Sequence, residues 1–234
     1  MGFQQMALPV TLPDDETFSS FFGGDNSHVV KQLESGLTSL NTSSFNFVYL
    51  CGFAESGKSH LLYATCVRAQ ELGLACFLLS FKDLAWLNPD VLDDLEKLDV
   101  ICIDDIQVIA GDPVWEKALF NFFNRFNAAG KMLVIAGDLL PNMLNIELPD
   151  LESRLQWGTT FQIRSMSDDD KAEALVRRAN MRGLTLTEEA TRFLLSRVSR
   201  DMRALLDILD KLDHASIVEQ RKLTIPFIKT TLNL

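Results

Sequence analysis

The chain has 234 residues, of which 22 are basic and 32 acidic, so its formal net charge is −10. This length suits one α/β domain with a small second domain, and a hydrophobic fraction of 47% can fill a core. The acidic balance argues against a large non-specific DNA-binding surface, which needs lysine and arginine opposite the phosphates. The sequence contains neither the roughly 20-residue apolar run of a membrane helix nor a signal peptide, so we expect a cytoplasmic protein without membrane contact.

Helical periodicity appears first at residues 27–40, and short apolar runs then alternate with helical segments. We predict strands at 45–51, 75–80, 100–104, 132–136 and 159–163, with helices at 58–72 and 115–129. Residues 83–98 are predicted as an irregular helix that is interrupted at Asn88-Pro89. Strands separated by helices form β-α-β units, in which helices cover both faces of a parallel sheet. The fold class expected is therefore α/β, with a five-stranded parallel sheet.

The strand pattern stops after residue 165. Helices are predicted at 168–182, 187–197 and 201–219, with Ser167 and Thr187 as N-caps and Gly183 as a stop, and residues 222–224 and 226–233 complete the chain. Residues 1–165 hold 10 basic and 21 acidic side chains (−11), whereas 166–234 hold 12 and 11 (+1). We therefore expect a flexible tail at 1–13, an α/β domain at 14–165 and a helical lid at 166–234.

The four cysteines stand singly. They are flanked by apolar residues and show no metal-ligand spacing, so we expect reduced, buried thiols and no cysteine-based metal site.

One segment fits the phosphate-binding pattern G-x-x-x-x-G-K-[ST]: Gly52, Phe53, Ala54, Glu55, Ser56, Gly57, Lys58 and Ser59. It lies between a predicted strand and a predicted helix. In that place backbone N–H groups and the helix N-terminus attract phosphate. We predict that Lys58 reaches the β- and γ-phosphates and that Ser59 is a Mg²⁺ ligand. The alternative is a structural glycine turn, which would not explain why a strand precedes the segment and a helix follows it.

Two further strand ends carry carboxylates. Residues 100–104 end in Asp104, a candidate Mg²⁺ ligand, and Asp105 follows as a candidate for orienting an attacking water. Asp138 follows the fourth strand and could contact the γ-phosphate or that water. Each aspartate could instead begin an ordinary turn.

Two arginines are candidates for phosphate contact, because guanidinium groups stay charged and can bind phosphate in a fork. Arg154 precedes Gln156-Trp157-Gly158, and Arg203 begins a lid helix. From spacing alone, each is more often a solvated surface arginine.

The P-loop, the Ile103–Gln107 run, Asp138, the Leu-Glu-Ser-Arg-Leu-Gln-Trp-Gly segment and the lid Asp-x-Arg together resemble the AAA+ ATPases. Among these the chain is similar to the DnaA-related family of replication initiators, over about residues 16–234. The sequence stops before a helix-turn-helix domain. We therefore expect a member of the Hda branch, whose proteins inactivate DnaA.

This resemblance implies a bound adenine nucleotide with Mg²⁺, with ADP favoured over ATP in the working form. The nucleotide would contact residues 52–59 and His60, with Phe22 and Asn26 near its base and Arg203 closing over its phosphates. Arg154 would act in trans as an arginine finger on ATP-bound DnaA. Catalytic roles are expected for Arg154, Asp105 and Asp138. The carboxylate of Glu55 should face solvent, since it would otherwise repel phosphate.

The N-terminal tail resembles a peptide that binds the β sliding clamp of the replicative polymerase, through Gln5, Met6, Leu8, Pro9 and Val10. DNA would then be reached only through the clamp, which would associate the protein with the nucleoid. An accidental hexapeptide is the alternative. Two other functions stay open: an ATPase loader that remodels a helicase or another replication protein by its own hydrolysis cycle, and a plain nucleotide-binding module. The protein could also form a homo-oligomer.

Overall fold

The computed structural model describes residues 16–40, 45–198 and 201–234. A parallel sheet of five strands lies at the centre of the first part, in the order β2-β3-β4-β1-β5. The strands are β1 (Asn46–Cys51), β2 (Cys76–Ser80), β3 (Val100–Asp104), β4 (Met132–Gly137) and β5 (Thr159–Gln162). The predicted α/β class and its five-stranded parallel sheet are confirmed.

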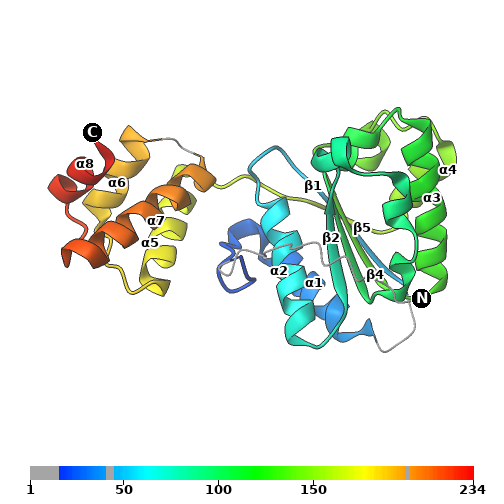
Figure 1. Ribbon diagram of the computed structural model, residues 1–234, viewed down its shortest axis with the longest axis horizontal. Coiled ribbons are helices and arrows are strands. Elements are labelled where there is room, and N and C mark those ends of the chain that lie inside the picture. Colours follow the sequence, from blue (N-terminus) through cyan, green and yellow to red (C-terminus); the bar gives the residue numbers. More distant parts are fainter. Residues whose placement is uncertain (1–15, 41–44, 199–200) are drawn as a thin grey trace.

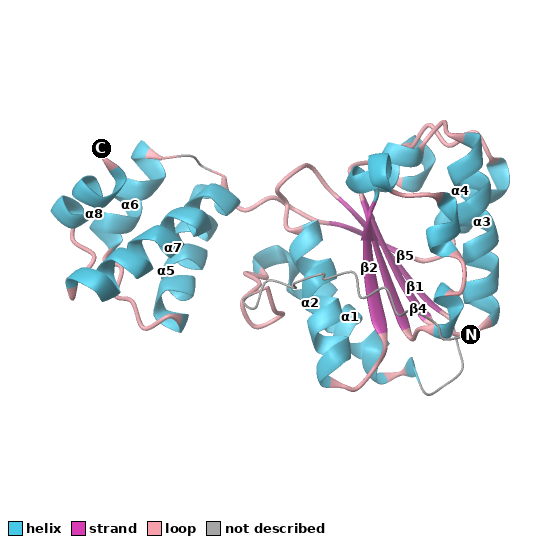
Figure 2. Cartoon of the chain, viewed as in Figure 1, coloured by secondary structure: helices cyan, strands magenta, loops and turns pink. Residues whose placement is uncertain are grey.

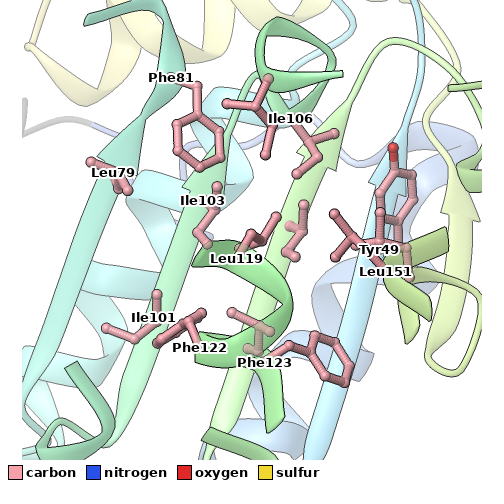
Figure 3. Close-up of a cluster of buried hydrophobic side chains, with 14 of the residues drawn as sticks. Tyr49, Leu79, Phe81, Ile101, Ile103, Ile106, Leu119, Phe122, Phe123 and Leu151 are labelled. Carbon is pink, nitrogen blue, oxygen red and sulfur yellow. The ribbon is translucent and has the colours of Figure 1, made fainter. Parts of the chain in front are cut away.

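Helices cover both faces of this sheet (Figure 1). α1 (Ser27–Thr38) and α2 (Lys58–Glu71) lie on one face, and α3 (Pro113–Ala128) and α4 (Pro149–Leu155) lie on the other (Figure 2). Because side chains alternate along a strand, β1 directs Val48 and Leu50 to the α1–α2 face and Tyr49 to the α3–α4 face. Figure 3 shows that second cluster, in which Phe122 and Phe123 of α3 pack on the strands.

Two stretches differ from the predictions. The helix predicted at 83–98 is wrong, because three short 3₁₀ segments occupy the region: η3 (Phe81–Trp86), η4 (Pro89–Leu92) and η5 (Leu95–Lys97). Asn88 caps η4 just before Pro89, and Asp94 has a left-handed φ of 66°, so the chain turns at both places. Conversely, α4 was not predicted. Further 3₁₀ turns are η1 (Gly24–Asn26), η6 (Ile106–Ile109) and η7 (Pro141–Met143).

The helices after the sheet form a separate bundle: α5 (Asp168–Met181), α6 (Glu188–Arg197), α7 (Met202–Glu219) and α8 (Ile225–Leu232). They enclose a core of their own, centred on Leu175, Leu194, Leu209 and Phe227. The predicted caps Ser167 and Thr187 are confirmed by their hydrogen bonds to N3 amides. The division at residue 165 stays a prediction, but it falls between the end of β5 and the start of α5.

The N-terminal segment packs against the sheet domain through its phenylalanines. Phe21 is buried and Phe18 partly buried against the α1–α2 cluster. The predicted tail at 1–13, with the proposed clamp-binding residues, lies outside the described residues. In the part of the chain that the structure describes, no helix is long and apolar enough to cross a membrane. All four cysteines are free thiols; Cys51, Cys66 and Cys102 are buried and Cys76 is half-buried.

Candidate nucleotide-binding site

The glycine-rich loop joins the end of β1 to the start of α2, the place that its sequence pattern predicts. Gly57 is the residue before α2 and has a φ of 97°, which disfavours other residues. A Cβ at Gly52 would lie 2.7 Å from the Ile163 carbonyl oxygen and 2.8 Å from Ser56 Oγ. Both glycines are therefore required by the path of the backbone, and the first N–H groups of a helix that begins here are available to bind phosphate.

Lys58 is buried with its ammonium inside this loop. Its Nζ donates to the carbonyl oxygens of Gly52 (2.6 Å) and Phe53 (2.9 Å) and lies 3.2 Å from Asp138 Oδ1. The P-loop lysine therefore contacts the carboxylate that follows β4. An ammonium group inside a loop that also offers backbone N–H groups is suited to bind phosphate.

Ser59 and Asp104 lie next to each other at the ends of α2 and β3. Ser59 Oγ donates to Asp104 Oδ2 at 2.6 Å. Burial raises the pKa of Asp104, while the hydrogen bond from Ser59 opposes that shift. A hydroxyl and a carboxylate side by side form an oxygen donor set, which suits the hard ion Mg²⁺.

Asp105 follows β3 in a left-handed conformation, with a φ of 59°, and is 6% exposed. Its Oδ1 lies 2.9 Å from Lys82 Nζ and accepts from Gln107 Nε2 at 3.1 Å, and its Oδ2 accepts from Ser80 Oγ at 3.2 Å. Gln107 also accepts the backbone N–H of Asp138 at 3.2 Å. One amide side chain thus links the carboxylates that follow β3 and β4.

A cavity of about 420 Å³ brings these elements together with the lid. Its walls contain thirteen of the predicted site residues: Phe22, Asn26, Ala54, Glu55, Ser56, Gly57, Lys58, Ser59, His60, Asp104, Asp105, Asp138 and Arg203. Ser56 Oγ is buried with no hydrogen-bond partner in the described structure. A cavity of this size, with amides, cations and an unsatisfied hydroxyl at one end, fits a nucleotide and Mg²⁺.

The N-terminal segment forms one wall of the cavity. His60 Nε2 donates to the Thr17 carbonyl oxygen at 2.9 Å. Asn26 bonds both backbone groups of Arg164, donating to the carbonyl oxygen at 2.9 Å and accepting the N–H at 3.0 Å. Asn26 therefore ties this wall to the connection between β5 and the lid.

Several predicted residues lie elsewhere. Phe53 is 78% exposed, and neither Phe53 nor Gly52 is among the residues that line the cavity. Glu55 is an exposed residue of the cavity wall, and the orientation of its carboxylate toward solvent stays a prediction. Arg154 is on α4, on the sheet face opposite α2 (Figure 1), and does not line the cavity among the residues described.

Arg154 is held by its own neighbours. Its Nε donates to Asn124 Oδ1 on α3 at 3.0 Å, and its guanidinium carbon lies 3.7 Å from the centroid of the Trp157 ring. Trp157 is 54% exposed. The arginine is thus oriented from two sides at the protein surface.

Two basic residues of the cavity were missed by sequence reasoning. Lys82 lies two residues beyond β2, and Arg178 is 4% exposed on α5. Neither stands in a recognisable motif, because tertiary packing alone brings each to the cavity.

Residues 168–232 match the family described as "Hda, lid domain", and residues 88–162 match the bacterial DnaA ATPase domain. In structure, the chain is similar to domain III of the Thermotoga maritima replication initiation protein DnaA, with 23% identity and a TM-score of 0.73 over 94% of this chain and 97% of that one.

It is also similar to AMPPCP-bound DnaA from Aquifex aeolicus (21% identity, TM-score 0.69, covering 86% of this chain and 65% of that one). A third similar structure is the Thermotoga maritima RuvB Holliday junction branch migration motor (17% identity, TM-score 0.67, covering 93% and 71%). The first match covers the lid, and the second covers the sheet domain from η4 to β5. Over the matched residues the chain is therefore DnaA-related, with a lid of the Hda type and the fold of DnaA domain III.

Proposed function

We propose that this chain is a negative regulator of replication initiation that stimulates hydrolysis of ATP bound to DnaA. In this proposal a nucleotide, ADP rather than ATP in the working form, occupies the cavity and keeps the two domains in a binding-competent arrangement. Residues 5–10 bind the β sliding clamp on DNA, and ATP-bound DnaA docks on the sheet domain.

The observation that carries the proposal is the place of Arg154. An arginine that served this chain's own nucleotide would have to reach the cavity, whereas Arg154 is held on α4 across the sheet. Its contacts with Asn124 and Trp157 orient the guanidinium at the surface. Such an arginine is suited to enter another protein's site and stabilise charge on a transferring phosphoryl group.

The nucleotide proposal rests on the cavity. Lys58 would hold the β-phosphate, and Ser59 and Asp104 would hold Mg²⁺, which neutralises phosphate charge when bound. Arg203 of α7 lines the cavity from the lid and would contact the phosphates from that side. The AMPPCP-bound DnaA from Aquifex aeolicus, with the same fold, supports an adenine nucleotide.

A second candidate is an ATPase loader that remodels a helicase or another replication protein by its own hydrolysis cycle. The observation that favours it is the complete set of Lys58, Ser59, Asp104 and Asp105 in one cavity. The two functions differ in whose ATP is consumed.

The test measures hydrolysis of labelled ATP bound to DnaA, with clamp-loaded DNA, in the presence and absence of this protein. The regulator predicts that hydrolysis accelerates only when clamp and protein are both present. Rapid turnover of free ATP by this protein alone, with no effect on DnaA-bound ATP, would favour the loader instead.

A further inference from the structure

Asn26 occupies the position before α1, where an asparagine side chain usually caps the helix by accepting a backbone N–H. Within the described residues it makes no capping bond to α1, although it is only 5% exposed. It lies in the wall of the nucleotide-binding cavity. The polar atoms of this side chain are therefore used for something other than the helix that they precede.

Their partner is the backbone of Arg164. Asn26 Nδ2 donates to the Arg164 carbonyl oxygen at 2.9 Å, and Asn26 Oδ1 accepts the Arg164 N–H at 3.0 Å. The preceding residue, Ile163, still donates its N–H to the carbonyl oxygen of Cys51 in β1, at 2.6 Å. Asn26 thus holds the backbone at the point where the chain leaves the sheet and runs toward α5.

The two bonds occupy the edge of the amide that could read a base. An asparagine recognises adenine by donating and accepting at the same time, with its nitrogen and oxygen side by side. In Asn26 that pair of atoms faces the peptide group of Arg164. We therefore expect no bidentate contact between Asn26 and the base of a bound nucleotide.

The lid wall of the cavity begins just beyond Arg164. α5 contributes Ala174 to this wall, and α7 contributes Arg203. The distance of both residues from the P-loop depends on the direction in which residues 164–167 leave the sheet. A fixed backbone at Arg164 consequently fixes where the lid cation Arg203 lies.

The N-terminal segment also contacts the lid at a second point. Arg177 of α5 donates from Nη2 to the Ser19 carbonyl oxygen at 2.7 Å. Thr17, in the same segment, is hydrogen-bonded to His60 of α2 at 2.9 Å, so the segment is attached to the sheet domain. The contact of Arg177 is exposed to water, whereas Asn26 is buried. The two bonds of Asn26 should therefore contribute more to the position of the lid.

We propose that Asn26 is a positioning residue, which holds the connection to the lid so that Arg203 reaches the phosphates of the nucleotide. The inference rests on the proposed function, in which a nucleotide occupies the cavity. Without the two bonds, a smaller fraction of molecules has the lid in place, and the apparent affinity for the nucleotide falls in proportion. The preference for one base over another stays the same.

The experiment measures binding of ADP and of inosine diphosphate to the full chain and to Asn26→Ala by calorimetry. The base of inosine diphosphate carries a carbonyl oxygen where adenine carries an amino group, so loss of a residue that reads adenine changes the ratio of the two affinities. We expect both affinities to fall about tenfold, the scale of one to two neutral hydrogen bonds, with their ratio unchanged. Asn180→Ala, at an exposed position of α5, should bind both nucleotides like the unaltered protein.

Two further readouts separate positioning from a general loss of folding. Arg203→Ala should weaken ADP binding in the unaltered protein and have little further effect together with Asn26→Ala, because the lid then no longer brings Arg203 to the phosphates. Hydrogen exchange should show that the Arg164 amide loses its protection in Asn26→Ala while the amides of β1 and β4 keep theirs. Asn26→Ser, whose single hydroxyl cannot make both bonds, should give the same results and serves if Asn26→Ala does not fold.

Three outcomes would overturn the inference. They are a changed ratio of the ADP and inosine diphosphate affinities, an unchanged affinity for ADP, and losses from Asn26→Ala and Arg203→Ala that multiply in the double variant. Failure of the unaltered protein to bind ADP would contradict the proposed function itself, and is seen before any variant is compared.

Discussion

Glu116 offers a quantitative test of how α4, and with it Arg154, is held in place. The carboxylate is fully buried on α3. Its Oε1 accepts the backbone N–H groups of Gly111 (2.8 Å) and Glu147 (3.1 Å), and its Oε2 accepts those of Glu147 (3.0 Å) and Leu148 (2.8 Å). Leu148 is the residue that precedes α4. One carboxylate therefore fastens the start of the helix that carries Arg154.

The change Glu116→Ala removes the acceptor of three backbone N–H groups. Hydrogen bonds to a charged group contribute about 1.5–3 kcal/mol each, and a donor left buried without a partner loses its full solvation. Removing the carboxylate also relieves its own desolvation cost, which offsets part of the loss. We expect the free energy of unfolding to fall by about 3–5 kcal/mol, the range of a broken buried polar network.

Urea unfolding followed by far-ultraviolet circular dichroism measures this loss. Glu34→Ala is the matched control, because Glu34 lies exposed on α1 and should change stability by less than about 0.5 kcal/mol. The Glu116 variant should also stimulate DnaA less than the control at the same folded concentration. A loss below about 1 kcal/mol for Glu116→Ala would refute the reasoning.

Three further outcomes are expected. Ser167→Ala should cost about 1 kcal/mol in lid stability, because it removes a capping box. Hydrogen bonds from Ser167 lower the pKa of Asp170 from its usual value of 3.8. The stability that these bonds give is therefore present above pH 3.8 and is lost as the pH falls through the lowered pKa. Denaturation of the unaltered protein and of Ser167→Ala between about pH 7 and 2 measures this loss. Lys58→Ala should weaken nucleotide binding roughly 10- to 100-fold by calorimetry, by loss of a charged hydrogen bond; unchanged affinity would exclude Lys58 from the phosphate site. Deleting residues 1–13 should abolish binding to immobilised clamp and leave nucleotide affinity unchanged, and retained clamp binding would contradict the role of residues 5–10.

The sheet was predictable because its three central strands, β1, β3 and β4, are buried almost throughout. Apolar runs such as 100–104, bounded by turn residues, have no competing interpretation once helices alternate with them. The helix prediction for residues 83–98 was wrong for a local reason. Pro89 and the left-handed Asp94 divide the helical pattern into separate 3₁₀ turns. α4 has only seven residues, too few for periodicity to reveal.

The candidate site was predictable where residues are close in sequence. The conformation of the P-loop follows from its own sequence pattern. The parallel pairing of β3 and β4 brings Asp104 and Asp138, which lie at the ends of these strands, to one edge of the sheet. Lys82 and Arg178 could not be predicted in this way, because they reach the cavity through the packing of η3 and of the lid. The link made by Gln107 between two strand ends also depends on tertiary structure.

The most direct test of the proposed function is single-turnover hydrolysis of ATP on DnaA, with clamp-loaded DNA, by the unaltered chain and by Arg154→Ala. Arginine fingers contribute about 10³–10⁵-fold to such rates, so the variant should leave DnaA near its unstimulated rate while binding nucleotide normally. Arg68→Ala, a surface arginine of α2 paired with Glu71, should stimulate like the unaltered protein. Stimulation by Arg154→Ala equal to that of the unaltered protein would contradict the trans role of Arg154.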